Sequence, residues 1–190
     1  MYSREELLGF FKKTGVLQEG HFVLSSGRHA NKYLQCAKIL QYPKYTQKLS
    51  SDIAEKWKDK NIELVVGPAI GGIVLSYAVA QALSTRSIFT ERKNAKMMLR
   101  RSFNIKAREK VLVVEDVVTT GGSVKEVIDL LEDKDADIIG ISSIVNRGDN
   151  VDFHYPFRPL LDLYIPTYLP EKCPMCKKGE KIIKPGSREG

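Results

Sequence analysis

Val111-Leu-Val-Val-Glu-Asp-Val-Val-Thr-Thr-Gly-Gly-Ser123 is the stretch of sequence that decides the fold. Its first four residues, 111–114, form an unbroken aliphatic run that is typical of a strand covered on both faces. Two carboxylates, Glu115 and Asp116, come next, and hydroxyl and glycine residues occupy 119–123. Apolar residues at helical spacing follow directly. The stretch therefore predicts a buried strand, a loop of small residues and a helix, in that order.

A loop of small residues between a strand and a helix is suited to hold a phosphate group. Its backbone N–H groups can surround the phosphate oxygens, and the dipole of the following helix favours negative charge. The chain contains neither G-x-x-x-x-G-K-[ST] nor G-x-G-x-x-G, so the common nucleotide motifs do not apply. Carboxylates beside a phosphate repel it unless they serve sugar hydroxyls or a magnesium ion. A ribose 5-phosphate that carries a pyrophosphate meets both requirements.

The stretch 115–123 resembles the signature that binds phosphoribosyl pyrophosphate (PRPP) in the type I phosphoribosyltransferases. The resemblance implies an α/β fold in which helices flank a central, mainly parallel sheet and a small N-terminal hood is added. Mg²⁺ is the implied cofactor, held through PRPP and through waters near the two carboxylates and not by direct protein ligands. Asp116 is implied to be catalytic. The residues implied to bind PRPP here are Glu115, Asp116, Val117, Val118, Thr119, Thr120, Gly121, Gly122 and Ser123.

The composition is that of one ordinary globular domain. The chain has 190 residues, 43% of them apolar and 28% charged. We expect a single domain over 1–190, with a hood from 1–40, a core over about 41–150 and an irregular C-terminal part at 151–190. No apolar run is long enough to cross a bilayer, and no signal peptide is visible. Three cysteines argue against a secreted disulfide framework, so a cytoplasmic location is expected.

The net charge of +7 favours an anionic partner, which could be nucleic acid, a membrane surface or a polyanionic small molecule. Much of the positive charge lies in one segment that only Glu109 opposes. The basic residues of this segment are Arg92, Lys93, Lys96, Arg100, Arg101, Lys106, Arg108 and Lys110. A focused basic segment suits a phosphorylated ligand at least as well as it suits a nucleic acid.

Strands and helices alternate along the chain, which predicts a parallel sheet with helices on both faces. Ser3 and Glu6 form a capping-box pattern at the start of a first helix, and Pro43 opens a longer one. Short strands are expected at 21–24 and 32–36. Further strands are expected at 62–66, 87–90, 111–114, 138–145 and near 161–165, with helices over 73–83 and after 123.

A second small-residue loop, Gly67-Pro-Ala-Ile-Gly-Gly72, also lies between a strand and a helix. Ligands of open α/β sheets collect at the carboxyl ends of parallel strands, where two such loops meet. Because Gly71 and Gly72 lack side chains, their N–H groups can approach an oxyanion closely. We therefore assign the loop at 67–72, and Gly71 in particular, to the pyrophosphate of PRPP, and the loop at 119–123 to the 5-phosphate.

The segment Glu91-Arg-Lys-Asn-Ala-Lys-Met-Met98 lies where type I phosphoribosyltransferases have a mobile loop that closes over the substrate. In the orotate enzymes this loop resembles Arg-Lys-x-x-Lys-x-His. Arg92, Lys93 and Lys96 match its basic positions, whereas Met98 stands where histidine is frequent. The resemblance implies that all three basic residues bind PRPP. Arg92 and Lys96 would act in catalysis by stabilising charge on the departing pyrophosphate.

The same segment leads to a prediction about assembly. Residues 91–101 contain too few apolar side chains to pack on their own sheet, so we expect a loop that is mobile without ligand. The resembling orotate enzymes are dimers in which this loop crosses the interface. We therefore expect a homodimer in which the loop at 91–101 reaches the neighbouring active site.

Two further matches point to orotate as the base. Phe22-Val-Leu-Ser-Ser-Gly-Arg28 resembles the hood motif F-x-L-x-S-G-R of orotate phosphoribosyltransferases, with Ser25 where many members carry lysine. Ile144-Val-Asn-Arg147 ends a strand with an arginine where the family places one against the carboxylate of orotate. A planar guanidinium can pair with a carboxylate through two hydrogen bonds. By the same match, Thr119 would hydrogen-bond the pyrimidine ring, and the implied activity is transfer of the phosphoribosyl group to orotate in pyrimidine (UMP) biosynthesis.

Cys173-Pro-Met-Cys176 has the spacing of half of a zinc site. A closed structural site needs four ligands, and the residues that remain to supply two of them are Cys36, His21, His29 and His154. Two interpretations are open at this point: a pair of reduced thiols that only packs, or a metal site.

Two other functions remain open from the sequence alone. One is a phosphoribosyltransferase for a purine or for uracil, for which an arginine at position 147 is less expected. The other is a PRPP-sensing regulator that binds nucleic acid; such regulators usually add a DNA-binding domain, for which 190 residues leave little room. We expect small-molecule substrates and neither a nucleic-acid partner nor a membrane partner.

Overall fold

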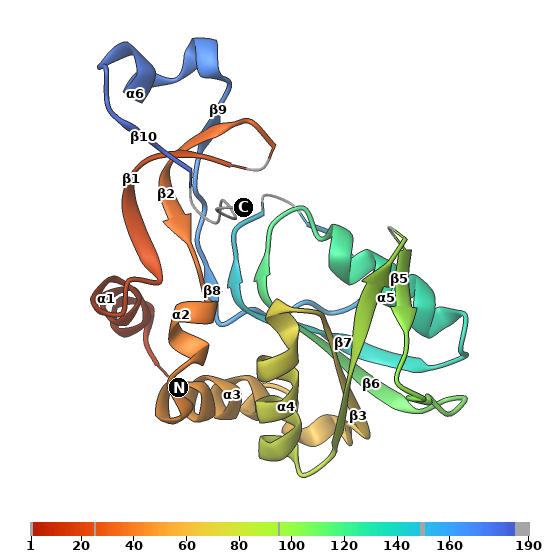
Figure 1. Cartoon of the computed structure of the whole chain (residues 1–190). Coiled ribbons are helices and arrows are strands. Elements are labelled where there is room, and N and C mark those ends of the chain that lie inside the picture. The colour runs from red at the N-terminus through yellow and green to blue at the C-terminus, as the bar shows by residue number, and fades with distance from the viewer. Residues whose placement is uncertain (1, 25, 95, 149–150, 185–190) are drawn as a thin grey trace.

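Two sheets of different size make up the fold. A computed structural model describes residues 2–24, 26–94, 96–148 and 151–184 of the chain (Figure 1). The larger sheet has the strand order β5-β4-β3-β6-β7-β8. Its strands are β3 (Leu64–Pro68), β4 (Arg86–Lys93), β5 (Lys96–Leu99), β6 (Lys110–Val118), β7 (Asp137–Asn146) and β8 (Leu161–Asp162). Apart from β5, which runs antiparallel to β4, neighbouring strands of this sheet are parallel.

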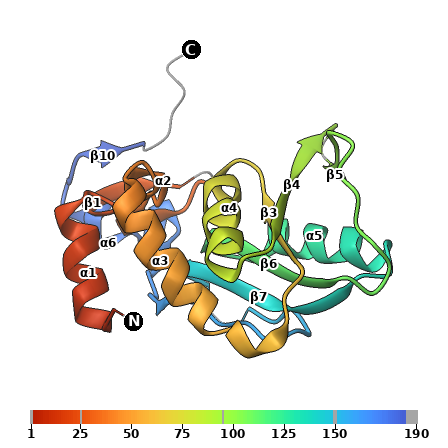
Figure 2. The ribbon, with the colours of Figure 1, turned by 90° about the horizontal axis from the view of Figure 1, so that it is seen from below.

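Helices cover both faces of the larger sheet (Figure 2). α3 (Pro43–Glu55) and α4 (Gly71–Leu83) pack on one face, where the core includes Leu112 and Val114 of β6. α5 (Gly122–Glu132) packs on the other face, against Val111 and Val113. Successive residues of a strand point to opposite faces, so the unbroken run 111–114 supplies both cores. The predicted order of buried strand, loop and helix is confirmed.

The N-terminal helix begins as its capping pattern predicts. α1 (Arg4–Lys13) follows Ser3, whose hydroxyl accepts a hydrogen bond from Glu6 N, while the carboxylate of Glu6 accepts one from Ser3 N. The predicted helix start at Pro43 is also confirmed, in α3. Two short helical turns, α2 (Ala37–Leu40) and η1 (Lys58–Lys60), complete this half of the chain.

The smaller sheet combines both ends of the chain, in the order β10-β1-β2-β9. Its long strands are β1 (Leu17–Val23) and β2 (His29–Leu34), which pair as a hairpin. Its outer strands, β9 (Thr167–Tyr168) and β10 (Ile182–Ile183), come from the C-terminal part, together with η2 (Pro170–Lys172) and α6 (Pro174–Lys177). The sequence predicted only one strand beyond position 155, near 161–165, and β9 and β10 were not predicted; strands this short carry no periodicity that a pattern could detect.

The expectation of a basic loop with too few apolar residues to pack on its own sheet was wrong. β4 continues to Lys93 and forms an antiparallel hairpin with β5, in which Arg92 lies opposite Met97. Met97 and Leu99 are half-buried and pack against the core under α5, while Lys96 and Met98 between them are exposed. This alternation is the strand period of two, and it lets a charged segment extend the sheet.

In the part of the chain that the structure describes, no helix is long and apolar enough to span a membrane.

Candidate functional site

The carboxyl ends of β6 and β7 place two predicted site residues side by side. Val118 of β6 is paired with Asn146 of β7, so the next residues of the two strands are Thr119 and Arg147. Arg147 N donates a hydrogen bond to Val118 O at 2.8 Å, which extends the parallel ladder by one step. Both side chains therefore leave the sheet at the same edge, as ligand-binding residues of open α/β sheets do.

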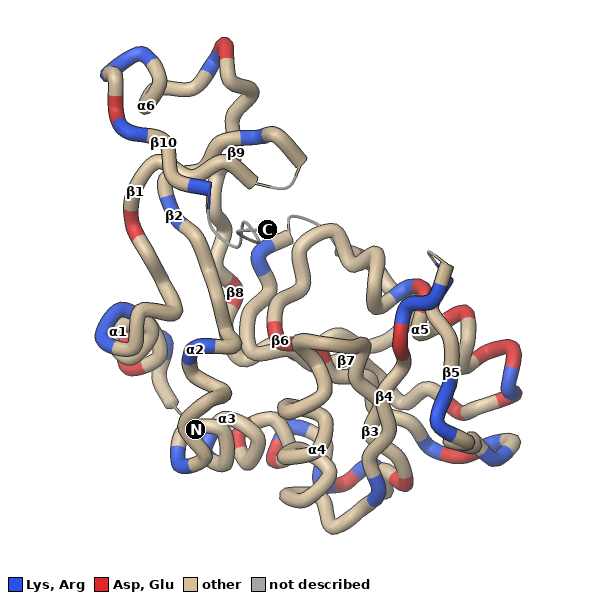
Figure 3. The backbone as a smooth tube through the Cα atoms, in the orientation of Figure 1, with Lys and Arg blue, Asp and Glu red and all other residues tan. Residues whose placement is uncertain are grey.

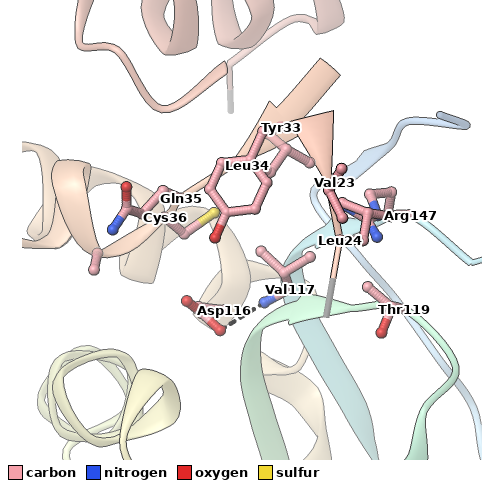
Figure 4. Close-up of a pocket in the computed structure, with 11 residues that line it drawn as sticks. Val23, Leu24, Tyr33, Leu34, Gln35, Cys36, Asp116, Val117, Thr119 and Arg147 are labelled. Carbon is pink, nitrogen blue, oxygen red and sulfur yellow. Dashed lines mark hydrogen bonds between the residues drawn. The ribbon is translucent and has the colours of Figure 1, made fainter. Parts of the chain in front are cut away.

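A cavity of about 480 Å³ opens between this edge and the smaller sheet (Figure 4). Asp116, Val117, Thr119 and Arg147 line it from the larger sheet, and side chains of the β1–β2 hairpin and α2 line it from above. The lining residues from this upper side are Val23, Leu24, Tyr33, Leu34, Gln35, Cys36 and Ala37. Thr119 and Arg147 also border a second cavity of about 450 Å³, together with Arg28, Thr120 and Lys125 among others. The two predicted orotate residues thus stand between two adjoining hollows.

The loop at 119–123 forms a small cradle. A cavity of about 70 Å³ is lined by Glu115, Val117, Val118, Thr119, Thr120, Gly121, Gly122, Ser123 and Val124. Gly121 has φ of 77°, and a Cβ there would lie 2.7 Å from the ring of Phe153, so only glycine fits this position. The N-cap residue of α5 is Gly121, which has no side chain to cap the helix, so the N–H groups of the first turn can face an anion.

The two carboxyl groups at the end of β6 are half-buried and close to each other. Burial, followed by the neighbouring Asp116 charge, raises the pKa of Glu115 to about 9. Burial also raises the pKa of Asp116. Each carboxylate accepts one backbone hydrogen bond, from Asp116 N to Glu115 Oε1 at 3.1 Å and from Val117 N to Asp116 Oδ1 at 2.8 Å. The pair therefore retains a proton at neutral pH until a ligand changes its surroundings.

Gly71 brings the second glycine loop against the carboxyl pair. A Cβ at this position would lie 2.7 Å from Asp116 Oδ1, so a side chain could not be placed without moving the carboxylate. The loop that precedes α4 contains a cis peptide bond between Ala69 and Ile70. The loop predicted to bind the pyrophosphate thus reaches Asp116, which lies three residues before the loop at 119–123.

Arg147 presents a half-buried guanidinium to the cavity. Among the residues that the structure describes, none forms a hydrogen bond or an ion pair with this side chain. Burial lowers the pKa of Arg147, and the nearby hydroxyl of Tyr33 acts in the opposite direction. A guanidinium that is partly removed from water without a partner is a favourable place for a carboxylate.

The predicted catalytic residues of the basic segment lie elsewhere. Arg92 is ion-paired with Glu126 of α5 at 2.8 Å. Figure 3 shows Lys and Arg positions, in blue, on the β4–β5 hairpin. Lys96 lines a separate hollow of about 400 Å³ with Glu126, Asp129 and Asp133. Over the described ranges, neither residue nor Lys93 lines the cavities that border Thr119. A single chain does not bring these cations to its own carboxyl pair.

Sequence reasoning missed the upper wall of the main cavity. Tyr33 lies in β2, Gln35 and Cys36 follow that strand, and no motif marks any of the three. Figure 4 shows the ring of Tyr33 and the thiol of Cys36 above Asp116 and Val117. Burial, and then the two carboxylates, raise the pKa of Cys36 well above its usual value, so the thiol is neutral. Ser25, predicted to replace the hood lysine, lies outside the described residues.

Comparison with known proteins gives consistent results. The family model described as phosphoribosyl transferase domain matches residues 37–156. The chain is 53% identical over 187 residues to an orotate phosphoribosyltransferase of Thermoanaerobacter sp. (strain X514), covering 98% of each sequence. It is 53% identical over 178 residues to the enzyme of the same name from Thermotoga maritima, covering 93% of this chain and 95% of the relative.

A solved structure shows the same fold. The orotate phosphoribosyltransferase of Aeropyrum pernix superimposes with a TM-score of 0.71 at 23% identity, over 83% of this chain and 93% of that one. At this identity the likeness concerns the fold alone.

The raised pKa of Glu115 predicts that Glu115→Gln stabilises the free protein in a pH-dependent way. In the unfolded chain the carboxyl ionises near its ordinary pKa, whereas folding holds it protonated up to about pH 9. The stability that Glu115 contributes is therefore complete below the unfolded pKa and is lost as the pH rises towards the folded pKa. At pH 8 the glutamine variant should unfold at least ~2–4 °C higher, corresponding to ~1 kcal/mol or more. Thermal melts at pH 5, 6.5 and 8 measure the effect, which should shrink towards pH 5.

Glu171→Gln, at an exposed glutamate, is the matched control and should change the melting temperature little at any of these pH values. Equal melting curves for wild type and Glu115→Gln at pH 8 would show that the carboxyl is not held protonated.

Proposed function

The chain belongs to the orotate phosphoribosyltransferases, enzymes of pyrimidine biosynthesis, and on that premise we propose how its residues carry out the transfer. The reaction joins N1 of orotate to C1 of the ribose of PRPP and releases pyrophosphate. One observation carries the proposal: the guanidinium of Arg147, which has no partner among the described residues, faces the same cavity as Asp116 and Thr119. A base that bears a carboxylate and a phosphorylated ribose would each find their complementary groups there.

The 5-phosphate of PRPP would bind in the cradle at 119–123. The N–H groups of the first turn of α5 point to one end of the helix, where the dipole favours negative charge. Hydroxyl groups of Thr119, Thr120 and Ser123 border the same small cavity and can donate further hydrogen bonds. The size of the cradle, about 70 Å³, suits a group of a few atoms and excludes a base.

Glu115 and Asp116 would bind the ribose hydroxyls. In the described part of the chain neither carboxylate forms an ion pair, so the pair lacks the cation that half-buried carboxylates usually have. A hydroxyl pair, or waters on a Mg²⁺ ion, would supply the missing donors or charge. These residues therefore fit Mg²⁺ that enters with PRPP, and this ion would neutralise negative charge on the pyrophosphate. The side chains themselves would orient the ribose so that C1 faces the base.

Gly71 would give the pyrophosphate access to backbone N–H groups beside Asp116. The absence of a Cβ leaves room for phosphate oxygens at the point where any side chain would collide with the carboxylate. C1 of the ribose would then lie between the glycine loop and the main cavity, with the leaving group on one side and the base on the other.

Orotate would occupy the main cavity. Its carboxylate would pair with Arg147, and its ring would contact the hydroxyl of Thr119 at the end of the neighbouring strand. Apolar side chains of the hood, Val23 and Leu24, would cover the ring and exclude water. No nucleophilic side chain is required, since cleavage of the C1–O bond needs mainly charge stabilisation and alignment.

We extend the proposal to a homodimer in which the β4–β5 hairpin serves the partner's site. The hairpin projects from the edge of the larger sheet (Figure 1), and, among the described residues, its cations do not line the cavities that border Thr119. The ion pair between Arg92 and Glu126 is partly exposed, at 45% and 36% side-chain exposure, so releasing it costs only ~0–1 kcal/mol. We propose that Arg92, Lys93 and Lys96 bind the pyrophosphate of a neighbouring subunit, where Arg92 and Lys96 would act in catalysis.

The three cysteines carry free thiols, which supports a reducing location, the cytoplasm. The cations of the hairpin are proposed to bind the pyrophosphate of PRPP, so no nucleic-acid partner is proposed.

We predict Mg²⁺-dependent release of pyrophosphate with orotate and PRPP, and much slower release with uracil, hypoxanthine or adenine. The reason is that only orotate offers a carboxylate to Arg147. A coupled pyrophosphate assay with each base, with and without Mg²⁺, measures the preference. Rates with another base that equal or exceed those with orotate would contradict the assignment.

Arg147→Ala should weaken the use of orotate far more than the use of PRPP. Losing the partner of a buried carboxylate costs about 2–4 kcal/mol, roughly a 30- to 800-fold rise in KM for orotate. Arg147→Lys keeps the charge but cannot form two parallel hydrogen bonds, so its KM for orotate should lie between those of Arg147→Ala and wild type. Steady-state kinetics with each substrate varied in turn test this. Comparable losses for both substrates would count against the role of Arg147.

Mixing two inactive chains should restore activity if the hairpin acts in the partner's site. Lys96→Ala and Asp116→Asn are combined under conditions that let dimers exchange. In a mixed dimer, one site then has neither substitution, so the activity should approach half that of a wild-type dimer. Each variant mixed with itself is the control and should stay inactive. Continued inactivity of the mixture, or sedimentation purely as a monomer, would refute action across an interface.

A further inference from the structure

Four potential metal ligands from opposite ends of the chain converge at the outer end of the smaller sheet. They are His21 of β1, His29 of β2, and Cys173 and Cys176 at α6. The ligand atoms of all four lie within 4.8 Å of one another. Figure 1 places α6 at the end of the smaller sheet that points away from the larger sheet. The cluster is therefore separate from the phosphate cradle and the carboxyl pair.

The distances within the cluster resemble those around a tetrahedral ion. Cys173 Sγ lies 3.6 Å from His21 Nε2, and Cys176 Sγ lies 3.7 Å from His21 Nε2 and 3.3 Å from His29 Nδ1. Zinc bond lengths of about 2.3 Å to sulfur and about 2.0–2.1 Å to nitrogen place tetrahedral nitrogen and sulfur ligands about 3.5 Å apart. The two ring nitrogens, 2.7 Å apart, would have to separate by roughly 0.6 Å.

The second ring nitrogen of His21 is held in the way that metal-bound histidines require. His21 Nδ1 lies 2.9 Å from the backbone oxygen of Glu180, and a carbonyl can only accept. Nδ1 therefore carries the proton, and Nε2 presents a lone pair to the centre of the cluster. Hydrogen bonding of the outer nitrogen to a carbonyl is a common support for a metal ligand, because it sets the tautomer and the ring orientation.

Burial strengthens the case for an ion. His21, His29 and Cys173 are buried, at 2%, 5% and 0% exposure, and Cys176 is partly exposed. Two imidazoles and two thiols gathered away from water offer more lone pairs than protons to satisfy them. A divalent cation at the centre would use all four at once. Two cysteines and two histidines form a ligand set that is typical of structural zinc. These four ligands fill a tetrahedral site, so no position stays open for catalysis.

A metal ion would strengthen the weak connection between the C-terminal part of the chain and the β1–β2 hairpin. β9 and β10 are two residues each, and strands this short add little stability of their own. Yet they hold the C-terminal part on the β1–β2 hairpin, where Arg28, next to His29, donates hydrogen bonds to Thr167 Oγ1 and Thr167 O at 2.8 Å each. The same hairpin supplies Val23 and Leu24 to the main cavity.

We propose that His21, His29, Cys173 and Cys176 bind one structural zinc ion that fastens the C-terminal segment to the hood hairpin. Of the two interpretations that the sequence left open, the geometry points to the metal site. The ion takes no part in the transfer reaction and acts by keeping the smaller sheet assembled.

Metal analysis of the full chain tests the proposal directly. The protein is produced in zinc-containing medium, purified without chelators, freed of any histidine tag and measured for zinc. We expect about one ion per chain in wild type, and less than about one fifth of that in Cys176→Ala. His154→Ala is the matched control, because His154 is exposed and outside the cluster, and it should keep the full zinc content.

Two measurements on wild type avoid the risk that a variant fails to fold. A zinc-selective chelator, added while Mg²⁺ is kept constant, should lower the melting temperature, and added Zn²⁺ should restore it. Replacement of zinc by Co²⁺ should give the visible bands of a tetrahedral ion and a thiolate charge-transfer band, both lost in Cys176→Ala. Folded protein that contains no zinc and shows neither the cobalt bands nor a chelator effect would overturn the proposal. So would a disulfide between Cys173 and Cys176 in protein purified without reductant.

Discussion

The half-buried Glu115–Asp116 pair at the carboxyl end of β6 is the constraint on which the rest of the site depends. A strand that is buried on both faces delivers the pair to a place where burial raises the pKa of both carboxyl groups. The neighbouring loop can approach only because Gly71 has no side chain to collide with Asp116. Such an arrangement costs stability in the free protein. Under the proposed function, the hydroxyls and the cation that a ligand brings would relieve this cost.

The parallel arrangement of strands explains why residues distant in sequence meet at this pair. β3, β6 and β7 run in one direction, so their following loops share one edge of the sheet. β4 is parallel to these strands as well, and the antiparallel β5 extends the sheet beside it; among the described residues, the cations of this hairpin do not line the cavities that border Thr119. The cations proposed to act in catalysis thus lie away from the carboxyl pair of their own chain. In the proposed homodimer, Arg92 and Lys96 of a partner would supply them.

The hood depends on both ends of the chain. Its central hairpin comes from β1 and β2, but the strands on either side come from the C-terminal part. Such a sheet closes only after the whole chain has been made, and its outer strands are too short to hold it by backbone hydrogen bonds alone. The cysteines and histidines at its outer end join the same two segments that β9 and β10 join. The stability of the hood and the shape of the main cavity are consequently linked through the hairpin, which contributes to both.

The local order of the site was readable in the sequence, because it rests on short-range rules. The run 111–114, the acidic pair and the small-residue loop predicted the strand, the cradle and the helix, and the capping pattern at Ser3 and Glu6 predicted the first helix. Pairings between distant segments were not readable. No local sequence pattern predicts that β5 extends the edge of the larger sheet or that Tyr33 and Cys36 line the upper side of the main cavity. Nor does a local pattern predict that the two histidines, His21 and His29, lie beside Cys173 and Cys176. Periodicity reports which face of an element is buried, whereas only the folded chain decides which element covers it.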